Sequence, residues 1–111
     1  MVVWSLRGAS DFARVRQSGR PGRAGHVGVR VLSVGDGLPC RLGMAVGRRV
    51  GNAVHRNLLR RRLRAIVTEV AAVLTGMLVT VRLLPGAADL TFEQLRQSVR
   101  RAFGAAQVQL P

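Results

Sequence analysis

The residues of this chain best suited to chemistry are arginines, and they crowd into one segment. Seven of the 17 residues from position 48 to position 64 are Arg, and no Asp or Glu occurs between positions 37 and 68. Guanidinium groups bind phosphate oxygens well, often through two parallel hydrogen bonds. An acid-free run of them within a largely hydrophobic chain predicts contact with a polyanion. We call residues 48–64 the basic tract.

The spacing within the basic tract also favours phosphate binding. Arg56, Arg60 and Arg64 recur every four residues, so they share one face of a helix. Like charges at this spacing destabilise a helix by roughly 0.2–0.5 kcal/mol per pair. Arg48 and Arg49 precede the helix start, where positive charge opposes the helix dipole. Bound phosphate would reverse both penalties. The alternative is a solvated helix face, although such faces usually mix both signs of charge.

Groups that could catalyse a reaction are sparse. Two-metal hydrolysis needs clustered carboxylates, and a zinc site needs about four Cys, His or acidic ligands. One Cys, two His and five scattered acids do not supply either pattern. We therefore predict that the chain has no catalytic residue and binds no metal or cofactor by itself.

Composition limits the class of protein. A chain of 111 residues with 48% hydrophobic content fits one domain, residues 1–111, with one core. The net charge of +13 opposes compaction and favours a nucleic-acid partner. All 18 basic residues are Arg, which we attribute to a GC-rich genome rather than to function. A single Cys and the lack of a signal peptide predict a cytoplasmic protein. The longest apolar stretch, residues 70–81, is too short to span a membrane.

Hydrophobic periodicity and turn residues predict the order of elements. The expected elements are a helix at 11–18, a loop or short strand at 19–25, strands at 26–34 and 40–46, a helix at 53–75, a strand at 77–84, and a helix from 92 to about 106. Asn52 is the expected N-cap of the long helix. Thr91 and Gln94 form a capping box before the last one. The fold class is therefore α+β, a single-domain sandwich in the order α-β-β-(β)-α-β-α.

The same periodicity predicts which side chains are buried. For the long helix these are Val54, Leu58, Leu63, Ile66, Val67, Val70, Val73 and Leu74. For the last helix they are Phe92, Leu95, Val99 and Phe103. On the strand at 40–46, Gly43 and Ala45 share one face, and their small size indicates close packing or a surface kept open.

The basic tract also resembles a known family. Its run Gly51-Asn52-Ala53-Val54-x-Arg56-Asn57, followed by Arg60, Arg61 and Arg64, resembles the signature of the bacterial ribonuclease P protein. Arg48 and Arg49 match the basic pair before that signature. Weaker similarities at residues 11–19, 41–46, 79–82 and 90–93 extend the resemblance over nearly the whole chain.

The resemblance implies a fold, a function and a set of site residues. It implies a left-handed β-α-β crossover and a protein that assists a catalytic RNA, which with bound Mg²⁺ removes the 5′ leader from precursor tRNA. The implied partners are that RNA and precursor tRNA, with no membrane and no protein partner required. The implied RNA contacts are Arg48, Arg49, Asn52, Arg56, Asn57, Arg60, Arg61, Arg62 and Arg64. The implied leader cleft contains Phe12, Arg16, Val27 and Arg30.

This chain departs from the family pattern in two places. Leu58 replaces the last residue of an Arg-Asn-Arg triplet, and Arg62 could supply the missing contact from the next turn. Arg16, Val27 and Arg30 stand where the family often has cleft aromatics, and the chain has no Tyr. Guanidinium planes can stack on bases as aromatic rings do. The competing function is a non-enzymatic RNA-binding module such as a ribosomal protein; a DNA-binding protein is a weaker alternative.

Overall fold

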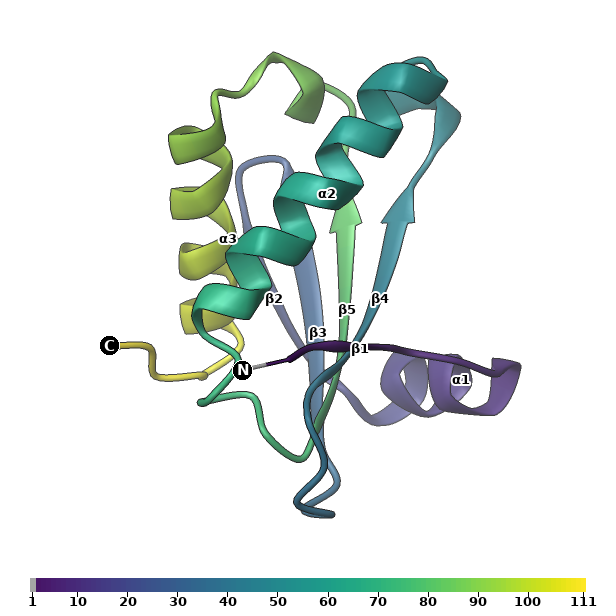
Figure 1. Cartoon of the computed structure of the whole chain (residues 1–111), viewed down its shortest axis with the longest axis vertical. Coiled ribbons are helices and arrows are strands. Elements are labelled where there is room, and N and C mark those ends of the chain that lie inside the picture. Colours follow the sequence, from purple (N-terminus) through teal and green to yellow (C-terminus); the bar gives the residue numbers. More distant parts are fainter. Residues whose placement is uncertain (1) are drawn as a thin grey trace.

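A five-stranded mixed sheet forms the centre of the protein (Figure 1), in a computed structural model that describes residues 2–111. The strands are β1 (Trp4–Ser5), β2 (Arg20–Ala24), β3 (Val27–Ser33), β4 (Arg41–Val46) and β5 (Met77–Leu83). The helices are α1 (Ala9–Ser18), α2 (Ala53–Glu69) and α3 (Phe92–Ala105), with short 3-10 turns η1 (Arg48–Val50) and η2 (Ala87–Asp89). The order of strands across the sheet is β1-β4-β5-β3-β2.

Strands β4 and β5 lie next to each other, run parallel, and are joined through α2. In Figure 1 both strands run upward, α2 crosses in front of them, and β5 lies to the left of β4. A right-handed connection would place β5 to the right, so this crossover is left-handed. Parallel crossovers are almost always right-handed. The resemblance to a family, and not the pattern of elements, therefore predicted the correct hand.

The main core lies between the sheet and the helix pair α2 and α3. Alternation along β3 buries Val27, Val29 and Val31 on this side and directs Gly28 and Arg30 to the other, as the sequence predicts. Helix α3 adds Leu95, Val99, Ala102 and Phe103 to this core, and α2 adds Leu59, Leu63, Ile66 and Val67.

Four predictions about buried residues are wrong, and one of them concerns Val73, which is only half-buried. Val54 is 76% exposed and Phe92 is 37% exposed, because each lies in the first turn of its helix, beyond the edge of the core. On α2 the buried leucine is Leu59, whereas Leu58 is only half-buried. Neighbouring leucines lie about 100° apart on a helix, and periodicity alone did not separate them.

The long helix is shorter than predicted, ending at Glu69 and not at Thr75. Residues 70–76 form tight turns. Their hydrogen bonds join residues three positions apart, such as Val73 N–H to Val70 O at 3.1 Å. Val70, Ala71 and Leu74 remain buried in these turns, so the apolar period continues after the helix has ended. Gly76, with φ of 75°, then leads into β5.

The sheet contains two strands in addition to the three that the sequence predicted at 26–34, 40–46 and 77–84. The short strand left open at 19–25 is present as β2. Strand β1 was not predicted; it consists of only two residues and pairs in parallel with β4. Between β5 and α3 the chain forms the turn η2.

Helix α1 covers part of the other face of the sheet. Val15 packs there with Leu6 and Leu78 in a small second core. No other helix of residues 2–111 covers that face, which leaves the outward sides of β3, β4 and β5 open beside α1. No helix among the described residues is long and apolar enough to cross a membrane.

Candidate nucleic-acid interface

The basic tract begins at the end of β4 and continues along the first part of α2. Val50 is buried and anchors η1, whereas Arg48 and Arg49 on the same turn are exposed. Asn52 caps α2 as predicted, since its Oδ1 accepts a hydrogen bond from the His55 N–H at 2.9 Å. The fold therefore places the arginine pair directly before a helix N-terminus, whose free amides also favour anions.

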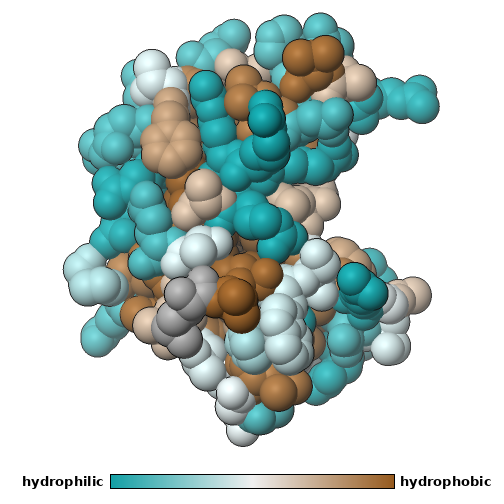
Figure 2. Space-filling view, in the orientation of Figure 1, coloured by the Kyte–Doolittle hydropathy of each residue, from teal (hydrophilic) through white to brown (hydrophobic). Residues whose placement is uncertain are grey.

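No arginine of the basic tract forms an ion pair with any residue from 2 to 111. The four ion pairs there use Arg14, Arg41 and Arg96, with the carboxylates of Asp11, Asp36, Glu69 and Glu93. Figure 2 shows hydrophilic side chains over the face on which α2 lies. The positive charge of the tract is thus not compensated within the fold.

Two arginines of the tract also hold structure together. Arg60 Nη1 donates to Asn57 Oδ1 at 3.2 Å, and its Nη2 donates to the Val46 carbonyl at 3.4 Å. Arg64 donates to the Val3 carbonyl at 3.0 Å and to Ser5 Oγ at 3.1 Å. These bonds tie α2 to β4 and to the N-terminal segment. A guanidinium has five N–H groups, so both side chains keep donors for a ligand.

Arg56 is half-buried on the same helix. Its Nε is the single buried side-chain nitrogen or oxygen in the described part of the chain that has no hydrogen-bond partner. Buried polar atoms are normally satisfied by protein or water. Arg61 and Asn57 are exposed, and Arg62 is half-buried beside them on α2. Helix α2 contains Arg56, Arg60 and Arg64 at a spacing of four residues, so these three share one face of it, as the sequence predicts.

A groove lies between α1 and the open face of the sheet. It encloses about 330 Å³, and its lining includes Phe12 and Arg16 from α1, Arg30 from β3, and Thr80 and Arg82 from β5. Strand register forms its floor, because Ala45 lies beside Arg82 and Arg82 beside Gly28. We call it the α1 groove.

A second hollow of about 570 Å³ continues the α1 groove toward the basic tract. It shares Arg16, Ala45 and Arg82 with the α1 groove and reaches Gly47 and Arg49. One strand of nucleic acid could therefore follow arginines from Arg30 to the start of α2 without leaving the surface.

Phe12 forms a wall of the α1 groove because Gly43 lets it approach the sheet. A Cβ placed on Gly43 would lie 2.6 Å from Phe12 Cε1, closer than carbon atoms can pack. Phe12 remains 38% exposed and lines the α1 groove, so one part of the residue is packed and another is open to a ligand. Ala45 on the same strand face is exposed. The two small residues thus have different roles: Gly43 allows close packing, and Ala45 keeps the groove open.

One predicted cleft residue does not line the groove. Val27 is fully buried in the main core, on the opposite face of β3 from Arg30. Side chains alternate between the two faces of β3, and Val27 points to the same face as the buried Val29 and Val31. Gly28, the next residue, faces the groove instead.

Sequence reasoning missed Arg82 as a candidate binding residue. It is exposed on β5, between inward-facing Val81 and Leu83. An arginine that interrupts an apolar strand was the available signal. Its significance depended on knowing which strands are neighbours.

Other potentially reactive groups do not form a site. Among residues 2–111, no three His, Cys, Asp or Glu side chains cluster as metal ligands would. Cys40 is buried, and burial raises the pKa of its thiol to about 11. It therefore stays protonated near neutral pH and is a poor nucleophile.

Comparisons with known proteins agree on one family. The model of the family Ribonuclease P matches residues 3–107. A ribonuclease P protein component from Pseudarthrobacter chlorophenolicus is 40% identical over 94 residues, covering 83% of this chain and 68% of the relative. One from Streptomyces avermitilis is 40% identical over 106 residues, covering 87% and 86%. The solved ribonuclease P protein of Staphylococcus aureus shares the fold, with a TM-score of 0.84 at 24% identity over 95% of this chain and 96% of that one.

Proposed function

Since this chain belongs to the ribonuclease P protein family, we propose that its basic tract binds the catalytic RNA of that enzyme and its α1 groove holds the 5′ leader of precursor tRNA. Charge alone left a ribosomal RNA-binding protein as an alternative. The family match over residues 3–107 favours the accessory subunit of an endoribonuclease instead.

The observation that carries the proposal is the distribution of ion pairs. Within residues 2–111, every carboxylate that pairs does so outside the basic tract, and the tract's arginines have no anionic partner. Stability alone would favour mixed charges on these faces. Phosphates of a bound RNA would supply the missing anions.

The α1 groove has the features that a single-stranded leader needs. Nucleic-acid strands bind where stacking side chains alternate with positive charge. Phe12 offers a partly exposed aromatic side chain, and Arg16, Arg30 and Arg82 offer guanidinium planes and charge. The continuation to Arg49 would join the leader to the RNA-bound surface, where cleavage has to occur.

We assign the chemical step to the RNA. Among the described residues no three acidic, histidine or cysteine side chains cluster as metal ligands, and we propose that the Mg²⁺ needed for hydrolysis is held by the RNA. The chain's own residues neutralise phosphates and orient the substrate. We place the complex in the cytoplasm.

The test is cleavage of precursor tRNA by a bacterial ribonuclease P RNA at limiting Mg²⁺, with and without this protein. We expect the protein to increase the rate, and to do so more for a substrate with a 5′ leader than for one with a single leader nucleotide. The RNA alone at high Mg²⁺ is the control for RNA folding.

Two results would count against the proposal. Salt-sensitive RNA binding without any gain in cleavage would favour a structural RNA-binding protein. Cleavage by the protein in the absence of the RNA would contradict the assignment of the chemistry.

A further inference from the structure

We propose that a second groove, on the other side of α1, takes an unpaired nucleotide of the catalytic RNA, with its base stacked on Trp4. This groove encloses about 740 Å³, and its lining includes Trp4, Arg7, Asp11, Arg14, Leu38 and Arg41. We call it the Trp4 pocket. The inference rests on the proposed function, because it takes the same RNA as its partner.

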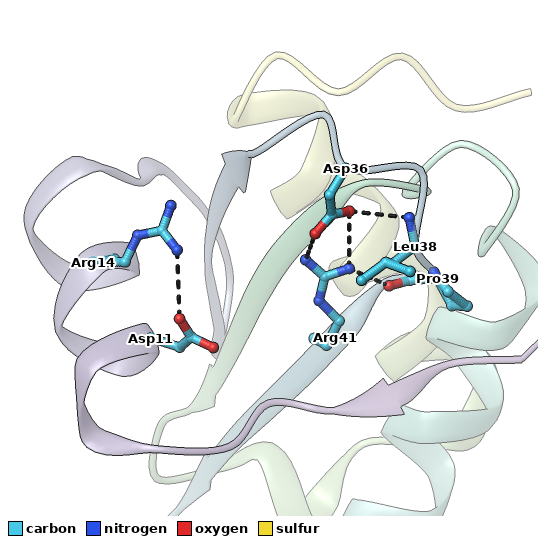
Figure 3. A network of polar contacts seen from close by, with 6 residues as sticks. All are labelled: Asp11, Arg14, Asp36, Leu38, Pro39 and Arg41. Atoms are coloured by element: carbon cyan, nitrogen blue, oxygen red, sulfur yellow. Dashed lines mark hydrogen bonds and ion pairs between the residues drawn. The ribbon is translucent and has the colours of Figure 1, made fainter.

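Helix α1 separates the Trp4 pocket from the α1 groove. Phe12 and Arg16 face the α1 groove, whereas Asp11 and Arg14 line the Trp4 pocket. Figure 3 shows Asp11 and Arg14 on α1 to one side and Asp36 and Arg41 to the other, and all four line the same hollow. The two hollows therefore offer separate paths on one face of the sheet.

Strand register builds the floor of the pocket. Trp4 lies beside Arg41, and Arg41 lies beside Leu78 of β5. Paired residues of parallel strands point to the same face of the sheet. Trp4, on the edge strand, thus stands at the rim of a floor made by Arg41 and Leu78.

The apolar part of the pocket is open to solvent. Trp4 is 46% exposed and Leu38 is 44% exposed, and both line the same hollow. The flat indole of Trp4, with the aliphatic side chain of Leu38 in the same hollow, suits a planar ligand better than an irregularly shaped one. Bases stack on aromatic side chains with little dependence on sequence.

The polar part of the pocket is held in place by Arg41. Its Nη1 donates to Asp36 Oδ1 at 3.2 Å and to the Pro39 carbonyl at 2.9 Å, and its Nη2 donates to Asp36 Oδ2 at 2.6 Å. The Leu38 N–H also donates to Asp36 Oδ1 at 3.0 Å. Leu38 is therefore positioned by a bonded loop before any ligand arrives (Figure 3).

Two further arginines remain available for phosphate. Arg14 is joined to Asp11 only at 3.5 Å, on the exposed side of α1. Arg7 is exposed and has no ion pair within residues 2–111. Arg7, Arg14 and Arg41 together outnumber Asp11 and Asp36, so the pocket is net positive.

A link to the basic tract identifies the catalytic RNA as the source of the nucleotide. Arg64 of α2 bonds to the Val3 carbonyl and to Ser5 Oγ, the residues on either side of Trp4. An RNA strand on α2 can therefore pass over the edge strand β1 and reach the Trp4 pocket. The leader, in contrast, is proposed to lie on the other side of α1.

Trp4 is the single tryptophan of the chain, so its fluorescence reports on this pocket alone. The experiment titrates the full-length protein with a bacterial ribonuclease P RNA and, separately, with a short single-stranded leader oligonucleotide. We expect the catalytic RNA to quench Trp4 and to protect it from acrylamide. The leader oligonucleotide should leave the emission nearly unchanged.

Substitutions test the energetic role of the pocket. Trp4→Ala should weaken binding of the catalytic RNA by about fivefold to a hundredfold, as expected for one stacked base. Trp4→Phe should restore most of the affinity. Arg7→Glu is a second variant whose exposed side chain has no ion pair among the described residues. Val2→Ala, an exposed apolar residue outside the pocket, is the matched control and should have no effect.

The outcomes separate this inference from the proposed function. If Trp4→Ala binds RNA as the wild type does, and Trp4 is not quenched while Arg61→Glu still weakens binding, the pocket assignment is wrong and the basic tract stands. Equal quenching by the leader oligonucleotide would contradict the catalytic RNA as the source. Quenching by an acidic peptide but not by RNA would replace the nucleotide with a protein partner. If the wild type shows no salt-sensitive RNA binding, the proposed function itself fails.

Discussion

Helices α2 and α3 both carry several arginines, but among the described residues only α3 has one, Arg96, that pairs with acids. On α3, Arg96 Nε donates to Glu69 Oε1 at 2.7 Å, and its Nη1 donates to Glu93 Oε1 at 3.2 Å. These carboxylates raise the pKa of Arg96. On α2, the arginines of the basic tract have no carboxylate partner among the described residues. Arginine thus joins two helices at Arg96, whereas on α2 the charge of the tract's arginines has no opposite charge beside it within residues 2–111.

The difference separates charge used for folding from charge used for binding. Arg96 connects α3 to the end of α2 through Glu69, which is a structural role. The basic tract repeats charge along a helix face and before a helix N-terminus, at a cost to stability. Counting arginines along the chain would not have shown this difference. It depends on where the five acids lie in the fold.

The largest expected effect comes from reversing charge in the basic tract. Arg56→Glu combined with Arg60→Glu should weaken binding of the catalytic RNA at least about tenfold, since each charge-assisted hydrogen bond contributes roughly 1.5–3 kcal/mol. Filter binding at fixed salt measures the loss. The matched control is the same double reversal on α3, Arg100→Glu with Arg101→Glu. Equal losses in both variants would remove the distinction between the helices.

A smaller effect is expected in the α1 groove. Phe12→Ala should weaken binding of precursor tRNA by about 1–3 kcal/mol, the contribution of one stacked base, and should leave mature tRNA unaffected. Competition binding with both tRNAs measures the difference. Phe92→Ala is the matched control, because Phe92 on α3 has nearly the same exposure, 37% against 38%. If leader-free tRNA lost as much affinity, Phe12 would have a folding role only.

The N-caps allow a direct comparison of the two helices. Asn52→Ala and Thr91→Ala should each lower the free energy of unfolding by about 1 kcal/mol, because each side chain accepts a backbone N–H at the start of its helix. Urea unfolding measures both losses. Only Asn52→Ala should also weaken RNA binding, since only α2 begins at the basic tract. Weaker binding in both variants would point to a general loss of structure.

The smallest expected effect is the loss of stability at low pH, when Asp36 becomes protonated. The hydrogen bonds from Arg41, and then that from the Leu38 N–H, hold the pKa of Asp36 below its ordinary value. The ion pair therefore adds stability above the ordinary aspartate pKa and loses it as pH falls through the lowered one. Carbon NMR of the Asp36 carboxyl should show this low pKa, and Arg41→Gln should raise it. An unchanged pKa in that variant would mean that Arg41 is not the cause.

The sequence predicted those parts of the fold that depend on local chemistry. Asn52 and the Thr91–Gln94 box start their helices as predicted, and the alternation along β3 separates Val29 from Arg30. These features depend on neighbours within a few residues. The left-handed crossover came from the family resemblance, because no local signal determines the hand of a connection between distant strands.

The remaining parts depend on where the core and the sheet end. Val54 and Phe92 have the apolar character of buried residues, but they lie where the helices extend past the sheet. Val27 follows the strand alternation into the core and not into the α1 groove. Arg82 became a candidate only when β3, β4 and β5 were known to be neighbours. The predicted RNA contacts of the basic tract remain predictions until binding is measured.

The most direct test compares the salt dependence of catalytic-RNA binding for the wild type, Arg61→Glu and Arg101→Glu. Both arginines are exposed on a helix, and neither has an ion pair among residues 2–111. Each phosphate contact contributes roughly 0.7–0.9 to the slope of log affinity against log salt. The account predicts that Arg61→Glu makes the slope shallower by about that amount and that Arg101→Glu leaves it unchanged. Equal slopes for the two variants would contradict the assignment of RNA binding to the basic tract.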